Sequence, residues 1–217
     1  MLISFDRTKF PLFAMEGIGI EIHLLPVTKW QFEQYVVESG WVDRPGYKKM
    51  LALNPGVSPE QFTVDQRERL FVTGILPEEA QAFARWLGQG FELPTVEEWR
   101  AVYATLRRTP LPRYDLPSEV IEGTAGIILN ELSVQLNARS ILDLTLMGGG
   151  LVEWVRQAES WVGLGAPRPR FHPNLWNPLD HKVRPIRLDE RLPYFGFRLV
   201  RRGEWYLADR GNARFIY

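Results

Sequence analysis

The chain has 217 residues, of which 45% are hydrophobic and 24% charged, the composition of an ordinary globular protein. Its 26 basic and 26 acidic residues cancel, so no overall electric field draws the protein to nucleic acid or to an anionic membrane. The absence of cysteine excludes disulfides, thiolate nucleophiles and cysteine-bound zinc, copper or iron–sulfur centres.

The N-terminal segment MLISFDRTKF carries charged residues where a signal peptide has an apolar stretch. No apolar run approaches the roughly 18 residues that a membrane span needs. We therefore expect a cytoplasmic protein that has no membrane partner.

The first predicted elements are a strand and a capped helix. Residues 18–25, IGIEIHLL, alternate between apolar and polar side chains in the way that predicts a strand. Thr28 and Gln31 have the spacing of a capping box, in which each side chain binds the backbone N–H of the other residue. We expect the helix that begins there to end at Gly40, because glycine readily adopts the left-handed conformation found after helices.

A loop, a short strand and a second helix are predicted next. Residues 41–68 contain three prolines and two glycines, which predicts a long surface excursion. The segment LFVTGI, residues 70–75, predicts a short strand. Pro77 suits the first turn of a helix that ends before Gly88, because the N–H that proline lacks has no partner in that turn.

A third helix and a series of short strands complete the predicted elements. Thr95 and Glu98 form a second capping box, and Trp99 is expected to face inward from the helix that they begin. Residues 109–140 show no clear pattern. Short strands are predicted over 141–147, 151–156, 194–202, 204–208 and 213–217. This order favours an α+β fold, with helices in the first half and antiparallel strands in the second.

Four segments, in order, resemble motifs of the formylglycine-generating enzyme (sulfatase-modifying factor) family. They are PVTKWQFEQYV, ILPEEAQAFARWLGQGFELPTVEEWRAVY, LDLTLMGGGLVEWVRQ and YFGFRLVRR. The most specific are LPT-x-x-EW and EWV, and the resemblance spans roughly residues 20–202 with gaps. It implies one domain over residues 1–217 with a C-type-lectin-like fold, in which helices pack on a twisted antiparallel sheet with long irregular loops.

The residues of the EWV segment make physical sense without the family. Strand alternation places Leu151, Glu153 and Val155 on one face and Val152, Trp154 and Arg156 on the other. We interpret Glu153 as a hydrogen-bonded structural carboxylate rather than a catalytic group, because buried polar groups are nearly always paired. The expected structural core includes Trp99, Trp154 and Phe197.

The chemistry that the resemblance implies is missing from this protein. Oxidase members of the family use a pair of cysteines near the C-terminus to hold copper, and this sequence has none. Formylglycine generation is therefore excluded, because no soft thiolate ligand exists for Cu(I). Where the family has an asparagine before the EWV segment, this sequence has Gly149, Gly150 and Leu151, which argues against a calcium site there. We predict no catalytic residue, no metal and no cofactor.

The expected function is recognition of a protein or peptide by the loop-rich region of residues 157–194. Relatives on this scaffold serve as retroelement-diversified binding proteins and as adaptor or accessory parts of prokaryotic conflict and signalling systems, so the resemblance implies such a role. Aromatic and arginine side chains are favoured where binding energy concentrates. The predicted binding residues are Trp161, Arg168, Arg170, Phe171, His172, Asn174, Trp176, Asn177 and Arg184.

Two other functions stay open on the sequence. His172, Asp180 and His181 are two histidines and a carboxylate, the ligand types of an iron-dependent oxidoreductase. Residues 165–202 contain nine lysines or arginines and three acids, a local excess of positive charge that could bind nucleic acid.

Overall fold

A computed structural model of the protein describes residues 2–41, 46–54, 70–88, 90–108, 145, 147, 151–165, 187–202 and 214–215. The helices among these residues are α1 (Lys29–Ser39), α2 (Gly46–Leu53), α4 (Pro77–Leu87) and α5 (Val96–Leu106). The strands among them are β1 (Leu2–Phe5), β2 (Pro11–Met15), β3 (Ile20–His23), β4 (Phe91–Glu92), β5 (Val152–Gln157), β6 (Ser160–Gly165), β7 (Phe195–Gly196), β8 (Val200–Arg201) and β9 (Arg214–Phe215).

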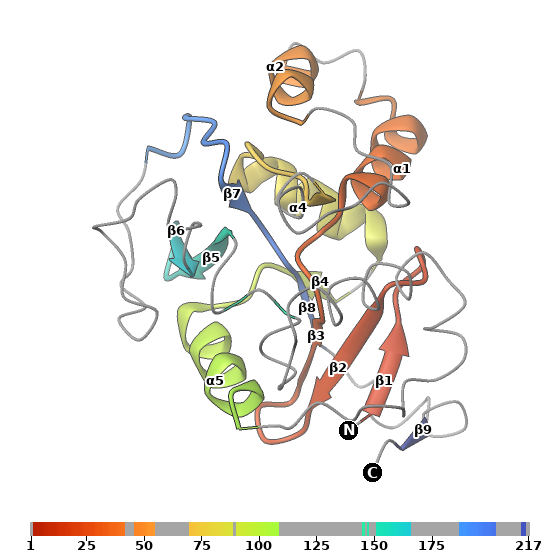
Figure 1. The fold of residues 1–217 in the computed structure, drawn as a ribbon, viewed down its shortest axis with the longest axis vertical. Helices are drawn as coiled ribbons and strands as arrows, with labels where there is room; N and C mark the ends of the chain where they lie inside the picture. The colour runs from red at the N-terminus through yellow and green to blue at the C-terminus, as the bar shows by residue number, and fades with distance from the viewer. Residues whose placement is uncertain are drawn as a thin grey trace.

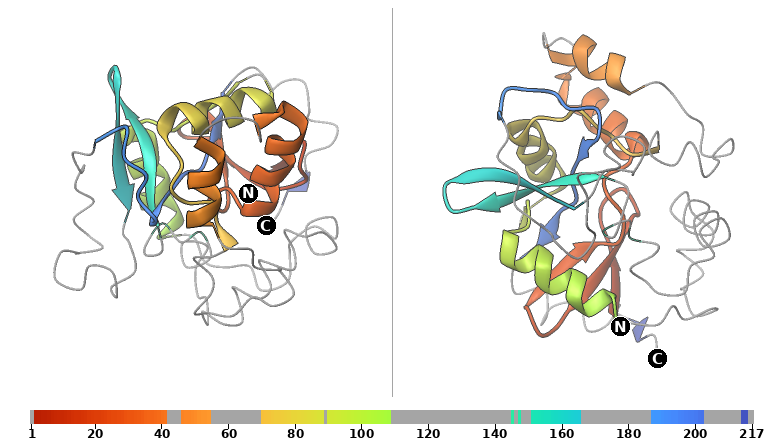
Figure 2. Two further views of the ribbon diagram at one scale, coloured as in Figure 1. Left: turned by 90° about the horizontal axis from the view of Figure 1, so that it is seen from above. Right: turned by 60° about the vertical axis from the view of Figure 1, so that its left-hand side comes forward.

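The strands form two sheets, and the predicted α+β class is confirmed. One sheet has the order β4-β8-β3-β2-β1-β9, and all of its pairs are antiparallel. The other has the order β6-β5-β7, in which β5 pairs antiparallel with β6 and parallel with β7. Helices α1, α2 and α4 gather at one end of the larger sheet, and α5 lies beside it (Figure 1). The β5–β6 hairpin projects from the body of the domain (Figure 2).

Two hydrophobic clusters form the core, and β5 lies between them. One cluster packs the larger sheet against α5 and includes Trp99, Leu151 and Val155. The other packs α1, α2 and α4 and includes Val152 and Trp154. The predicted alternation of side chains along β5 is therefore confirmed, because consecutive residues enter different clusters. Trp99, Trp154 and Phe197 are fully buried.

The predicted helix ends are confirmed. Thr28 and Gln31 form a complete capping box at the start of α1, and Gly40 ends that helix in the left-handed conformation with φ 65°. Thr95 and Glu98 form the capping box of α5. Pro77 occupies the first turn of α4. These signals act between neighbouring residues, so the rest of the fold does not override them.

The segment 41–68, predicted as a long surface excursion, contains a helix where the structure describes it. Residues 46–53 form α2, Trp41 is 2% exposed and Met50 is 4% exposed, so this segment belongs partly to the core. The buried Asn54 donates to the carbonyl oxygens of Met50 and Thr73 and accepts from the Thr73 N–H, which ties the end of α2 to the next segment. Gly46 is the first residue of this helix.

Two predicted strands, at residues 70–75 and 141–147, also differ from the structure. Residues 70–75 form no strand, and only Phe71 makes an isolated bridge, with Thr28. The Val72 N–H donates to the Val27 carbonyl, whereas the Gly74 N–H donates to that of Phe195, so successive bonds go to different elements. Of residues 141–147, the structure describes Thr145 and Met147, and neither is in a strand.

Candidate functional site

The EWV segment holds its glutamate in a fully buried ion pair with an arginine from the last part of the sequence. Arg198 Nε donates to Glu153 Oε2 at 2.6 Å, and Arg198 Nη2 donates to Glu153 Oε1 at 2.7 Å. Trp99 Nε1 donates to the same carboxylate at 3.1 Å. The remaining guanidinium hydrogens bind the backbone carbonyls of His23, Leu24 and Thr145. Both oxygens of Glu153 are therefore committed to the fold, as expected of a structural carboxylate.

A second buried polar network lies at the turn between β1 and β2. Asp6 Oδ1 accepts from the Thr8 N–H at 2.7 Å, the Thr8 hydroxyl at 2.6 Å and the Phe10 N–H at 3.0 Å. Asp6 Oδ2 lies 3.0 Å from His23 Nε2 and accepts from Gln31 Nε2 at 3.1 Å. The network joins the β1–β2 turn to β3 and to the start of α1, where Gln31 is also part of the capping box.

Asp6 is held ionised by these contacts. Burial raises the pKa of Asp6, but the hydrogen bond and electrostatic interaction with His23 and the hydrogen bonds from Thr8 outweigh it. The pKa is therefore lower than its ordinary value of 3.8. The second ring nitrogen of His23, Nδ1, is buried and has no hydrogen-bond partner among the described residues, and the ring stacks on Phe91 with centroids 5.7 Å apart.

The arginines of the positively charged segment 165–202 are paired wherever the structure describes them. Arg187 pairs with Asp189 on the surface. Four others pair with carboxylates that lie outside the segment: Arg191 with Glu79, Arg198 with Glu153, Arg201 with Glu21, and Arg202 with Glu92 and Glu98. Acidic residues from the rest of the protein thus neutralise this part of the local positive charge, and most of these pairs join distant elements of the fold.

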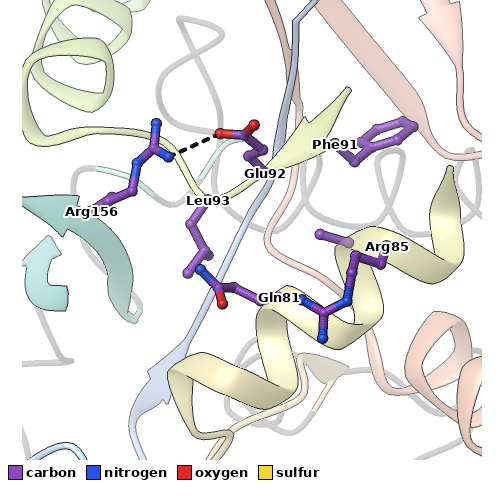
Figure 3. A pocket seen from close by; sticks show the side chains of 7 residues that line it. Gln81, Arg85, Phe91, Glu92, Leu93 and Arg156 are labelled. Atoms are coloured by element: carbon purple, nitrogen blue, oxygen red, sulfur yellow. Dashed lines mark ion pairs between the residues drawn. The ribbon is translucent and has the colours of Figure 1, made fainter. Parts of the chain in front are cut away.

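A half-open pocket with a volume of about 240 Å³ lies where α4, β4 and β5 meet (Figure 3). Its polar walls come from Gln81 and Arg85 on α4, Glu92 on β4 and Arg156 on β5. Its apolar lining comes from Ala84, Phe91 and Leu93. The isolated bridge between Thr95 and Arg156, with the hydrogen bond from the Arg156 N–H to the Pro94 carbonyl at 2.8 Å, holds β5 beside the segment that follows β4.

Glu92 is the centre of the charges around this pocket. It pairs with Arg156 at 3.2 Å and also with Arg202. Arg202 in turn donates to both oxygens of Glu98, at 2.9 and 2.5 Å. Burial raises the pKa of Glu98, but Arg202 and the Thr95 N–H outweigh it and hold that pKa below its ordinary value. The wall formed by α4 differs from the Glu92 side of the pocket. Its Arg85 is exposed and makes no ion pair with any residue that the structure describes.

Comparison with known protein families matches residues 6–209 to the FGE-sulfatase family, described as the sulfatase-modifying factor enzyme 1-like domain. The chain belongs to this family. A search of curated proteins finds no match. The mixed α+β architecture with antiparallel sheets and packed helices agrees with the C-type-lectin-like fold of this family, as predicted. This sulfatase-modifying factor-like domain contains no cysteine, so it lacks the thiols on which formylglycine generation depends.

Most residues predicted to bind a partner lie outside the described part of the domain. Trp161 is described: it is half-buried on β6, opposite Arg156 of β5, and its buried indole Nε1 has no hydrogen-bond partner in the part of the chain that the structure describes. The residues that fall outside are Arg168, Arg170, Phe171, His172, Asn174, Trp176, Asn177 and Arg184. The proposed iron ligands His172, Asp180 and His181 fall outside as well.

The sequence did not single out the pocket of this sulfatase-modifying factor-like domain. Two of its walls come from α4 and β4, which are close in the sequence, but the third comes from the distant β5, and its approach depends on the register between Thr95 and Arg156. Gln81 and Arg85, one turn apart on the polar face of α4, were the only local sign of it. Among the described residues, no group of three or more His, Asp or Glu side chains could hold a metal ion. No helix of the described part combines the length and apolar character needed to cross a membrane.

Proposed function

We propose that this sulfatase-modifying factor-like domain is a non-catalytic recognition module that binds a protein or peptide partner. The observation that carries the proposal is the pocket between α4, β4 and β5, with polar walls, an apolar lining and an open mouth. Its walls stand on regular elements rather than on loops, which suits a binding site that is formed before the partner arrives.

The burial and hydrogen bonding of Glu153 and Asp6 support recognition over catalysis. A general acid or base must reach the substrate, and its pKa is tuned toward the working pH. Glu153 is fully buried with both oxygens bound by Arg198 and Trp99, and Asp6 is buried with both oxygens bound in its own network. These groups hold sheets and helices together, and the thiols of the family's oxidases are missing.

The pairing of the arginines favours a protein partner over nucleic acid. Binding to a phosphate backbone needs several cations whose charge is available at the surface. Arg191, Arg198 and Arg201 instead form ion pairs in which their side chains are 12%, 0% and 21% exposed. In the described part of segment 165–202, these arginines therefore form ion pairs within the protein and do not present free charge at the surface.

A site-specific photo-crosslinker tests the recognition function in the full-length protein expressed in its source cells. Placed at Gln81, in the pocket wall, the crosslinker is expected to join the domain to a discrete protein partner. Lys49, exposed on α2, is the matched control position and is expected to give no such product. Identical products from the two positions, or none from either, would contradict the proposal.

The iron-dependent alternative has its own test. Stoichiometric iron in the purified full-length protein, lost in the His172→Ala variant and retained in His23→Ala, would replace recognition by oxidoreductase chemistry. The recognition proposal expects no stoichiometric metal in either variant or in the parent protein.

A further inference from the structure

We infer that the pocket between α4, β4 and β5 selects an acidic side chain of the partner, with Arg85 receiving its carboxylate. The inference rests on the proposed recognition function and goes beyond it by naming the chemistry of the ligand. A volume of about 240 Å³ lies below the roughly 300–1,000 Å³ typical of drug-sized ligand sites, so one amino-acid side chain is the appropriate occupant.

The position of Arg85 on α4 suits it to this role. Gln81 and Arg85 are four residues apart, so both side chains project from the same face of the helix, as Figure 3 shows. A guanidinium presents a planar fork of donors that matches a carboxylate, and the Gln81 amide can add a further donor. The neighbouring Leu93 and Ala84 offer apolar contact to the methylene groups of an acidic side chain.

The charges around the pocket leave one guanidinium in excess. Arg156 and Arg202 share Glu92, and Arg202 also binds Glu98, so these two arginines are balanced by two carboxylates. Arg85 has no carboxylate partner among the described residues, although it lines the same pocket. An incoming carboxylate would supply the missing negative charge, which is the electrostatic complementarity that sets specificity at interfaces.

The same balance disfavours a phosphate group. A phosphate monoester carries about −1.5 to −2 charges at neutral pH and is bound by clusters of arginines. Here a single arginine without an ion pair among the described residues faces the pocket, and the carboxylate of Glu92 in the opposite wall repels a second negative charge. A singly charged carboxylate matches the site better.

Glu92 also predicts a variant that gains affinity. Its carboxylate occupies the donors of Arg156 in the absence of a partner, so it competes with the ligand for that arginine. Glu92→Gln removes the competing charge and leaves Arg156 available to the ligand in addition to Arg85. Tighter binding cannot be produced by a variant that merely fails to fold, which keeps the inference testable even if other substitutions destabilise the domain.

The test uses small probes and nuclear magnetic resonance of the full-length protein labelled with nitrogen-15. The acidic probe is N-acetylglutamate α-amide, and N-acetylglutamine amide is its neutral counterpart. N-acetylalanine represents the terminal carboxylate of a polypeptide, and inorganic phosphate represents a phosphorylated partner. We expect saturable shifts of the pocket signals with the acidic probe, and weaker or no shifts with the other three.

The variants assign the binding to the pocket. Arg85→Gln is expected to weaken binding of the acidic probe about fivefold, as for the loss of one solvent-exposed charge pair. Glu92→Gln is expected to strengthen it, by about twofold to fivefold on the same basis. Arg108→Gln is the matched control: Arg108 is exposed just beyond the C-terminal end of α5 and is not among the residues that line the pocket, so its removal should leave affinity unchanged.

Each contrary result has a defined meaning. The inference would be overturned if the neutral probe bound as tightly as the acidic one, or if phosphate or N-acetylalanine bound more tightly. It would also be overturned if the Arg85→Gln variant bound the acidic probe as tightly as the Arg108→Gln variant. A partner crosslinked at Gln81 alongside such a result would leave the recognition function standing. Selective carboxylate binding without any crosslinked partner would instead refute the recognition function while retaining the chemistry of the pocket.

Discussion

Arg198 and Glu153 form a two-bond ion pair in which the side chains are 0% and 1% exposed. Glu153 belongs to β5, and Arg198 lies between β7 of the smaller sheet and β8 of the larger one. The pair therefore stands where the polypeptide passes from one sheet to the other. Because the guanidinium also binds carbonyls that precede α1, the interaction joins the two halves of the sequence.

Removal of the Glu153 charge is expected to destabilise the domain strongly. Glu153→Gln leaves the Arg198 guanidinium buried without a counter-charge, which typically costs about 3–5 kcal/mol in the free energy of unfolding. Urea denaturation followed by tryptophan fluorescence measures the change. The control is Asp189→Asn, which removes an exposed ion pair with Arg187 and should alter stability by less than about 0.5 kcal/mol. Equal stability of the two variants would contradict the structural role of Glu153.

The helices were predictable because their signals are local. Thr28 with Gln31, and Thr95 with Glu98, each satisfy backbone donors within a single turn. A stretch of four residues is therefore enough to predict where each helix begins. Gly40 likewise ends α1 through its own backbone conformation. Such features require no knowledge of what the rest of the protein does.

The first two strands were not predictable from the same kind of pattern. All five residues of β2, PLFAM, are buried, so the strand lacks the alternation that marks a sheet with one face in water. Its neighbour β1 pairs both with β2 and with β9 at the other end of the sequence. A partner as distant as β9 leaves no local signal, and the pocket was missed for the same reason, because β5 is far in the sequence from α4 and β4.

The stability of the domain is expected to fall in acid partly through Asp6. The pKa of Asp6 is lower in the folded protein than its ordinary value of 3.8. The ionised carboxylate therefore contributes stability above that pH, and the contribution is lost as the pH falls below it, through the folded pKa.

Asp6→Asn should remove this contribution. The difference in unfolding free energy between the parent and the variant is expected to be larger at about pH 6 than at about pH 3, measured by urea denaturation. Asp189→Asn is the matched control, since Asp189 is exposed and its substitution should give a small difference at both values. A gap that stays constant or grows in acid would show that Asp6 does not act in this way.

The capping box of α5 is expected to stabilise the helix that carries Trp99. The Thr95 hydroxyl accepts from the Glu98 N–H at 3.2 Å, and Glu98 Oε2 accepts from the Thr95 N–H at 2.7 Å. Thr95→Ala should lower the free energy of unfolding by about 1 kcal/mol, because one backbone donor at the helix start loses its acceptor. Thr95→Ser keeps the oxygen and should restore most of that loss. If serine is no better than alanine at this position, the hydroxyl is not the stabilising group.

Gly90 is expected to be irreplaceable because it positions β4, the strand that supplies two of the residues lining the pocket. Its φ is 80°, and a Cβ at this position would overlap the carbonyl oxygen of Arg202. The Gly90 carbonyl accepts from the Arg202 N–H at 2.8 Å, so the backbone cannot move away without losing that bond. Gly90→Ala should therefore reduce the free energy of unfolding by more than about 2 kcal/mol, from backbone strain together with the steric overlap.

The same substitution should also weaken binding of N-acetylglutamate α-amide, because Phe91 and Glu92 directly follow the strained residue. Gly17→Ala is the matched control: apart from its chain neighbours, no described residue has an atom within 4 Å of the added Cβ, and the φ of Gly17 is not positive. That variant should keep both the stability and the affinity of the parent, as measured by urea denaturation and by probe titration. A Gly90→Ala domain that is destabilised yet binds the probe normally would separate the close contact at Gly90 from the geometry of the pocket.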